Sequence, residues 1–293
     1  MSSTPPISVL VTVYNRSKYV TVAIQSVLRS AFTDFELIVV DDASTDDSYE
    51  IARTAISGDS RCRIYKNERN LGQFQNRNKA VSYAAGKYIK YLDSDDLIYP
   101  YSLSIMYEAI SSFPTASHAI CHSLRDDVIP YPQCLSPREA YSRQFLGAGC
   151  MSAGPSGAII ERERFLEIGG YRMCGVASDI DLWFRLGALW DTVLIQPALI
   201  WWRRHEGQAF SARLSEIDYI QGEFCIISDA LNSVHCPLDE AARASARSRL
   251  RRNTARKLLR LATRQRQPHT AFQLWRRFGL TTRDFLAGMA GYR

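Results

Sequence analysis

Long apolar runs are missing from this chain of 293 residues, and none approaches the roughly 18 to 20 residues needed to cross a bilayer. The opening residues, Met1 to Pro6, show neither the basic nor the apolar stretch of a secretory leader. The seven cysteines are scattered without a Cys-x-x-Cys pair, a pattern that fits neither a zinc ribbon nor a disulfide framework. We therefore expect a cytoplasmic protein that does not span the membrane.

Acidic residues are nearly absent from the C-terminal end of the chain. From Ala241 to Arg293, Asp284 is the one acid against fourteen Lys and Arg. The net charge of this end is +13, which leaves −7 for the first 240 residues out of the total of +6. The sequence thus combines an acidic body, whose apolar content can fill a large core, with a basic tail.

Short apolar runs alternate with helical patterns over the first 95 residues. The predicted strands are 7–13, 35–40, 62–65 and 88–92, and the predicted helices between them are 22–28, 48–56 and 76–85. This alternation predicts an α/β fold with a mostly parallel, doubly wound sheet flanked by helices. Ligands of such sheets bind beyond the carboxyl ends of the strands, so the residues that follow each strand are the candidate site residues.

Polar side chains follow three of these predicted strands, at Tyr14-Asn15, Asp41-Asp42 and Asp93-Ser94-Asp95-Asp96. Carboxylates that meet at one edge of a sheet concentrate negative potential, which a cation or donor ligands must offset. Carboxylate oxygens suit Mg²⁺ or Mn²⁺, and Mg²⁺ is commonly shared with the phosphates of a substrate. A turn followed by a helix N-cap is the alternative, because Asp and Ser are frequent in both.

The second half of the chain is less regular. The sequence predicts a strand over 118–123, a helix over 180–189, a strand over 197–202 and amphipathic helices around 250–261 and 272–278. Prolines at 130, 132 and 137 predict a loop.

These motifs, in this order and spacing, resemble family 2 glycosyltransferases of the GT-A fold. The runs that carry the resemblance are 7–15, 41–46, 67–72, Arg77-Asn78 and 91–96 with Pro100, followed more loosely by Gly169-Gly170-Tyr171, 178–183 and Arg203-x-His205. The resemblance implies a GT-A domain over 1–215, with a nucleotide-sugar-binding half (1–110) and an acceptor-binding half (111–215). Residues 216–293 match no family and form a predicted basic helical extension.

The resemblance also implies roles for individual residues. Asp95 of the Asp-x-Asp motif and His205 are the implied ligands of Mn²⁺ or Mg²⁺, which acts as a Lewis acid toward the diphosphate leaving group. A structural histidine is the alternative for His205. The implied nucleotide-sugar-binding residues are Thr12, Val13, Tyr14, Asn15, Asp41, Asp42, Arg77, Asp93 and Ser94. Residues 208–211 are expected to belong to a lid over the donor.

Asp179 is the implied general base, because it matches the last carboxylate of the Glu-Asp pair of the family. A base at this position removes the proton of the acceptor hydroxyl as it attacks the anomeric carbon, so configuration inverts. A helix N-cap is the alternative role for Asp179. Ser178 stands where the family has Glu, which puts the usual acceptor contact in doubt.

The resulting hypothesis is an inverting, metal-dependent glycosyltransferase that uses a nucleotide sugar, expected to be a UDP-sugar. The expected acceptor is a hydroxyl of a glycan or lipid-linked oligosaccharide in cell-surface polysaccharide synthesis. A catalytically silent GT-A scaffold that binds glycan or nucleotide is the alternative. A dinucleotide dehydrogenase is disfavoured, because no Gly-x-Gly-x-x-Gly turn follows the first strand.

The basic extension has two possible partners. Arg-rich amphipathic helices bind anionic surfaces, and the favoured partner is the inner face of the membrane, to which the protein is expected to attach peripherally. Packing against the acidic body is the alternative. No nucleic-acid-binding module supports nucleic acid as a partner.

Overall fold

The structure is a computed structural model that describes residues 4–121, 129–175, 178–205 and 216–289. It contains an eight-stranded sheet in the order β3-β2-β1-β4-β8-β6-β9-β7. The predicted parallel half is confirmed: β1 (Ile7–Val13), β2 (Phe35–Asp41), β3 (Cys62–Lys66) and β4 (Tyr88–Asp93) pair in parallel. The helices between them are α1 (Val20–Leu28), α2 (Ser48–Ala55) and α3 (Gln73–Ser82).

The second half of the sheet is mixed. β8 (Ala158–Glu161) lies between β4 and β6 (Ala116–Cys121) and runs antiparallel to both. β9 (Asp191–Ile195) and β7 (Gln133–Leu135) complete the edge. The sequence missed β7, β8 and β9. It placed a strand over 197–202, where only β10 (Ile200–Trp201) forms, pairing with β5 (Leu97–Ile98) outside the large sheet.

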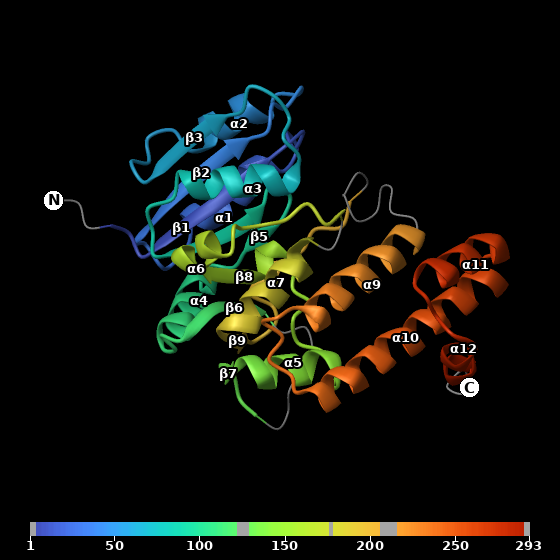
Figure 1. Ribbon diagram of the computed structural model, residues 1–293. Coiled ribbons are helices and arrows are strands. Elements are labelled where there is room, and N and C mark those ends of the chain that lie inside the picture. The colour runs from blue at the N-terminus through green and yellow to red at the C-terminus, as the bar shows by residue number, and fades with distance from the viewer. Residues whose placement is uncertain (1–3, 122–128, 176–177, 206–215, 290–293) are drawn as a thin grey trace.

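Helices cover both faces of the sheet (Figure 1). Side chains of a strand alternate between faces, so Leu10 and Ile38 enter one apolar cluster while Val9 and Leu37 enter the other. α1, α2 and α4 (Ser102–Ser111) pack on the second face. The first face carries α3, α5 (Pro137–Phe145), α7 (Ser178–Leu189) and α9 (Glu216–Asn232). A 3₁₀ turn, η1 (Pro155–Gly157), and α6 (Arg162–Glu167) flank β8.

The C-terminal extension is helical, as the sequence predicted. α10 (Glu240–Thr263), α11 (Pro268–Arg277) and α12 (Thr282–Met289) follow α9 and lie on one side of the molecule (Figure 1). Residues of α9 and the start of α10, among them Ile226 and Ala246, belong to the same apolar cluster as the sheet. The core therefore continues across residue 215, where the sequence placed a domain boundary. No helix of the described segments has the length and apolarity needed to cross a bilayer.

Candidate active site

The carboxyl ends of β1, β2 and β4 align at one edge of the sheet. Val13 pairs with Asp41, and Thr12 pairs with Asp93. The strand register therefore brings the three polar strand exits, at 14–15, 41–42 and 93–96, to the same edge.

The exit of β1 is tied to the exit of β2 through Asn15. Asn15 adopts a left-handed backbone with φ of 50°, a conformation that Asn tolerates better than most residues. Its side-chain oxygen accepts a hydrogen bond from the backbone N–H of Thr45 at 2.9 Å, and its own N–H donates to the hydroxyl of Ser44 at 3.0 Å. Tyr14, 44% exposed, is left at the rim, where its ring is accessible to a planar base.

The carboxylate of Asp42 is fully engaged by the loop before α3. It accepts hydrogen bonds from the Asn67 side chain at 2.7 Å and from the backbone N–H groups of Leu71 and Gly72 at 2.8 and 2.9 Å. A buried carboxylate with three donors holds its loop firmly. Asp42 thus fixes residues 67–72 next to the strand exits.

Asp41 and Asn67 each have a side-chain oxygen that can accept a further hydrogen bond. Asp41 is fully buried, and its Oδ1 accepts from the N–H of Ser44 at 3.0 Å. Its Oδ2 and the side-chain oxygen of Asn67 are buried without a hydrogen-bond partner among the described residues. Buried acceptors are rarely left unsatisfied, so both are candidates to receive a donor from a ligand.

Arg77 is a buried guanidinium with spare donors. Its Nη2 donates to Oδ1 of Asp93 at 2.5 Å, and the guanidinium lies 5.3 Å from the ring centre of Phe74. Its Nε and Nη1 are buried and lack a partner within the described part of the chain. Two unfilled, charged donors on a rigid planar group suit a phosphate oxygen or a ribose hydroxyl.

Two cationic or potentially cationic groups converge on Asp95. Its Oδ2 accepts from Nε of Arg16 at 2.9 Å and lies 2.9 Å from Nε2 of His205. The His205 ring packs on Tyr19 with centroids 4.5 Å apart, which holds the imidazole in place. The structure therefore brings together the two predicted metal ligands, which are 110 residues apart in the chain.

Arg203, two residues before His205, holds the acidic segment 93–96 in place. Arg203 donates from its backbone N–H to Asp96 at 3.1 Å and from its Nε to the carbonyl of Asp95 at 2.9 Å. Burial, reinforced by the negative charge of Asp93 and Asp95, raises the pKa of Asp96 to about 7. Ser94 is buried beside these groups. The expected lid at 208–211 lies outside the described residues.

The two candidate metal ligands, Asp95 and His205, meet in this part of the site. The described segments contain no group of three or more His, Cys, Asp and Glu that could hold a metal. Asp95 and His205 would supply two ligands, and a cation would take the place that the guanidinium of Arg16 now holds at the same Asp95 oxygen. A cation with two protein ligands completes its coordination with phosphate oxygens and water, as Mg²⁺ and Mn²⁺ do in nucleotide sites.

Asp179 lies in the first turn of α7 and is electrostatically coupled to this site. Burial raises its pKa above the ordinary value of an aspartate, opposed by the hydrogen bond from the Ile180 N–H at 2.9 Å and by the charge of Arg77. Ser178 is fully buried, donates to the carbonyl of Gly175 at 2.8 Å and accepts from the N–H of Cys174 at 3.0 Å. Ser178 therefore closes the turn before α7 and is not available to an acceptor.

The sequence analysis missed three residues that support the site. Arg16 contacts Asp95 from the exit of β1, and the hydroxyl of Ser156 accepts from the backbone N–H of Asp93 at 3.0 Å. Lys90 is fully buried in β4 and donates to the carbonyls of Tyr91, at 2.6 Å, and Ser156. Burial lowers the pKa of Lys90 to about 8. A lysine within an apolar strand was a visible signal, whereas nothing local marked Ser156.

A family model agrees with this geometry: the model of Glycosyl transferase family 2 matches residues 8–163, more than half of the chain. The chain belongs to this family. Glycosyltransferase GlyG of Streptococcus pneumoniae is 36% identical to it over 104 residues, which cover 36% of this chain and 35% of GlyG. An uncharacterized glycosyltransferase of Rickettsia prowazekii, RP339, is 26% identical over 227 residues, 73% of this chain and 69% of RP339. The match to GlyG thus spans about a third of that relative.

Solved structures of similar fold include a mannosyltransferase. TarS of S. aureus (residues 1–349), in complex with UDP-GlcNAc, superposes with a TM-score of 0.66 at 20% identity and covers 83% of this chain and 71% of that one. The mannosyltransferase PcManGT of Pyrobaculum calidifontis, in complex with GDP-Man and Mn²⁺, gives 0.61 at 16% identity and covers 99% and 86%. This member of family 2 therefore has the GT-A fold that the sequence predicted.

Proposed function

We propose that this glycosyltransferase is an inverting, metal-dependent enzyme that transfers a sugar from a UDP-sugar to a hydroxyl of a glycan or lipid-linked oligosaccharide in cell-surface polysaccharide synthesis. The observation that carries the proposal is the buried Arg77, which pairs with Asp93, acts electrostatically on Asp179 and keeps two donors unfilled. A diphosphate supplies the oxygens that these donors lack. The complexes of TarS with UDP-GlcNAc and of PcManGT with GDP-Man and Mn²⁺ support the donor class.

The residues divide into three groups by role. The base and ribose of the donor are bound by the exits of β1, β2 and β4, through Thr12, Val13, Tyr14, Asn15, Asp41, the loop held by Asp42, Asp93 and Ser94. Arg77 binds the diphosphate, and Asp95 with His205 holds the cation. When bound, the cation neutralises charge that develops on the departing diphosphate.

Asp179 accepts the proton of the attacking hydroxyl. Its carboxylate is partly buried in the first turn of α7 and carries a raised pKa, both of which suit a general base. Attack from the side opposite the diphosphate inverts the anomeric carbon.

Calorimetric titration with UDP, GDP and dTDP, each with Mn²⁺ and with EDTA, tests the donor site. We expect UDP to bind with Mn²⁺. EDTA is expected to weaken this binding strongly, because the diphosphate oxygens are themselves ligands of the cation. Tighter binding of GDP or dTDP would reassign the donor. No binding of any nucleotide would favour the silent scaffold.

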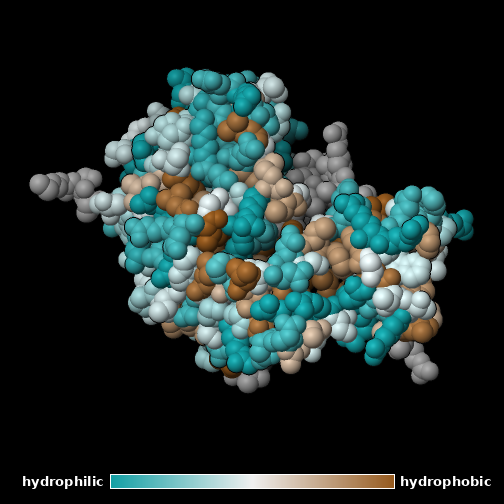
Figure 2. Space-filling model, in the orientation of Figure 1, coloured by the Kyte–Doolittle hydropathy of each residue, from teal (hydrophilic) through white to brown (hydrophobic). Residues whose placement is uncertain are grey.

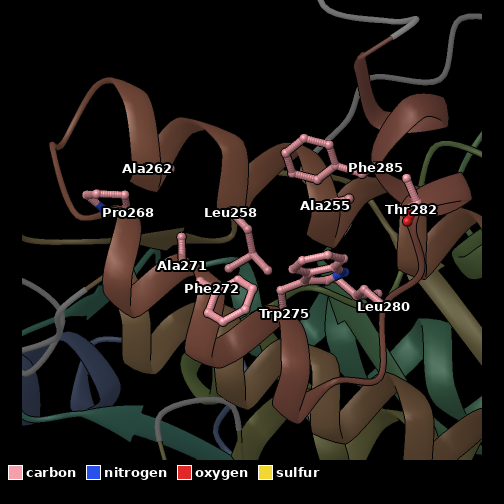
Figure 3. A pocket seen from close by; sticks show the side chains of 10 residues that line it. All are labelled: Ala255, Leu258, Ala262, Pro268, Ala271, Phe272, Trp275, Leu280, Thr282 and Phe285. Atoms are coloured by element: carbon pink, nitrogen blue, oxygen red, sulfur yellow. The ribbon is translucent and has the colours of Figure 1, made fainter.

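The basic extension is proposed to attach the enzyme to the anionic inner face of the membrane. An apolar hollow of about 220 Å³ opens between α10, α11 and α12, lined by side chains such as Leu258, Trp275 and Phe285 (Figure 3). Exposed apolar side chains accompany it, with Phe272 50% exposed and Leu286 58% exposed. Hydrophilic residues predominate along α10 on the face seen in Figure 2. Basic charge next to exposed apolar side chains is typical of interfacial helices.

Vesicle co-sedimentation tests this attachment. We expect retention on phosphatidylglycerol vesicles, release by high salt and no retention on phosphatidylcholine vesicles, because the attraction is electrostatic. The double variant Arg276→Glu/Arg283→Glu, at two exposed positions, is expected to weaken retention at least about tenfold, at about 1 kcal/mol per basic residue. Equal retention on both vesicle types would contradict the proposal.

A further inference from the structure

A second hollow, of about 140 Å³, lies beside the first turn of α7. Its lining includes Gln144 of α5, Ser152, Ile180 next to Asp179, and Tyr219 and Glu223 of α9. Most of these residues are far apart in the sequence. Tyr219 and Glu223 come from the extension, beyond residues 8–163 that the family model matches.

The two α9 residues are held in place by α10. Lys257 forms an ion pair with Glu223, and its Nζ lies 5.5 Å from the ring centre of Tyr219. The Tyr219 ring remains 42% exposed. Burial raises the pKa of Tyr219, and the negative charges of Glu223 and Asp179 add to the rise. Tyr219 and Glu223 line the hollow together with Ile180, the residue that follows Asp179.

This combination of groups suits a saccharide. An accessible aromatic ring can pack against the C–H face of a sugar, and the remaining polar groups can bind its hydroxyls. Glu223 offers acceptor oxygens, and Ser152 offers a hydroxyl. Apolar walls with a few placed polar groups are the usual design of a small-molecule site.

We propose that Tyr219 and Glu223 form the acceptor subsite and bind the sugar ring whose hydroxyl is presented to Asp179. The proposal rests on the proposed transferase function. The hydroxyl of Ser178 already makes two hydrogen bonds within the turn before α7. The carboxylate that binds the acceptor sugar is therefore Glu223 of α9, and not the residue that precedes Asp179. Acceptor selectivity is then a property of the extension.

The test measures binding of methyl glycosides of glucose, galactose, mannose and N-acetylglucosamine by saturation-transfer NMR, with UDP and diamagnetic Mg²⁺ present. We expect the wild type to bind at least one glycoside. Tyr219→Ala and Glu223→Gln are expected to weaken that binding about tenfold each, the scale of one lost stacking or hydrogen-bonding contact. Tyr219→Phe keeps the ring and is expected to lose less than Tyr219→Ala.

Two matched variants serve as controls. Tyr101→Ala removes an aromatic ring of similar exposure at the start of α4, and Glu240→Gln removes a glutamate that is paired with Arg247 on the same extension. Both are expected to bind glycosides and UDP like the wild type. UDP affinity is also expected to be unchanged in the Tyr219 and Glu223 variants, because these residues line the hollow beside α7, whereas the proposed donor residues lie at the exits of β1, β2 and β4.

The outcomes separate the subsite from the transferase function. Failure of UDP to bind the wild type would contradict the proposed function itself. Normal UDP binding, with no glycoside bound or with glycoside binding unchanged in Tyr219→Ala and Glu223→Gln, would overturn the acceptor subsite alone. Loss of UDP binding in those two variants would equally overturn it, since they would then act on the donor site.

Discussion

Asp179→Asn is expected to lower the transfer rate by about 10²- to 10⁴-fold, the usual contribution of a general base, while UDP affinity stays unchanged. Asn keeps the size of the side chain and an oxygen that can accept from the Ile180 N–H, so the first turn of α7 is preserved. The measurement is the steady-state release of UDP from a UDP-sugar with an acceptor present. Asp229→Asn, at an exposed aspartate of α9, is the control. A full transfer rate in Asp179→Asn would remove the proposed base.

The raised pKa of Asp179 gives this prediction a pH dependence. A base must be ionised to act, so the rate falls as pH drops through a pKa that lies above that of an ordinary aspartate. The same shift means that the ionised carboxylate is less favourable in the folded than in the unfolded protein. At neutral pH, Asp179→Asn is therefore expected to increase the free energy of unfolding, measured by urea denaturation.

Asp95→Asn is expected to weaken Mn²⁺-dependent UDP binding by at least about 100-fold, since the loss of even a residue that supports a ligand costs 10- to 100-fold. Binding should then no longer respond to EDTA. The amide oxygen can still accept from Arg16, which limits structural damage. Calorimetry compares this variant with Asp47→Asn, an exposed aspartate after β2 whose side chain makes no helix-capping hydrogen bond. Unchanged metal dependence in Asp95→Asn would refute its role as a ligand.

The parallel half of the fold was predictable because its information is local. β1, β2 and β4 are short apolar runs that end in polar residues, and the intervening helices carry their own periodicity. The second half of the sheet was not predicted, because β8 is only four residues long. Nothing in the composition of β8 indicates that it runs antiparallel to β4. β7 and α5 fell in a proline-punctuated stretch, although Pro137 opens α5 in a position where proline is favoured.

Sequence alone placed the polar exits of β1, β2 and β4 at one edge, because parallel strands share the direction of their carboxyl ends. The motifs also assigned the family. Only the tertiary structure decided which groups these side chains contact. Asp42 accepts hydrogen bonds from the loop before α3, and Asp95 contacts Arg16 and His205. The tertiary structure also brought Tyr219 of α9 and Ile180, the neighbour of Asp179, to the lining of one hollow. Such contacts depend on how distant segments pack into one core, and local sequence patterns do not encode that packing.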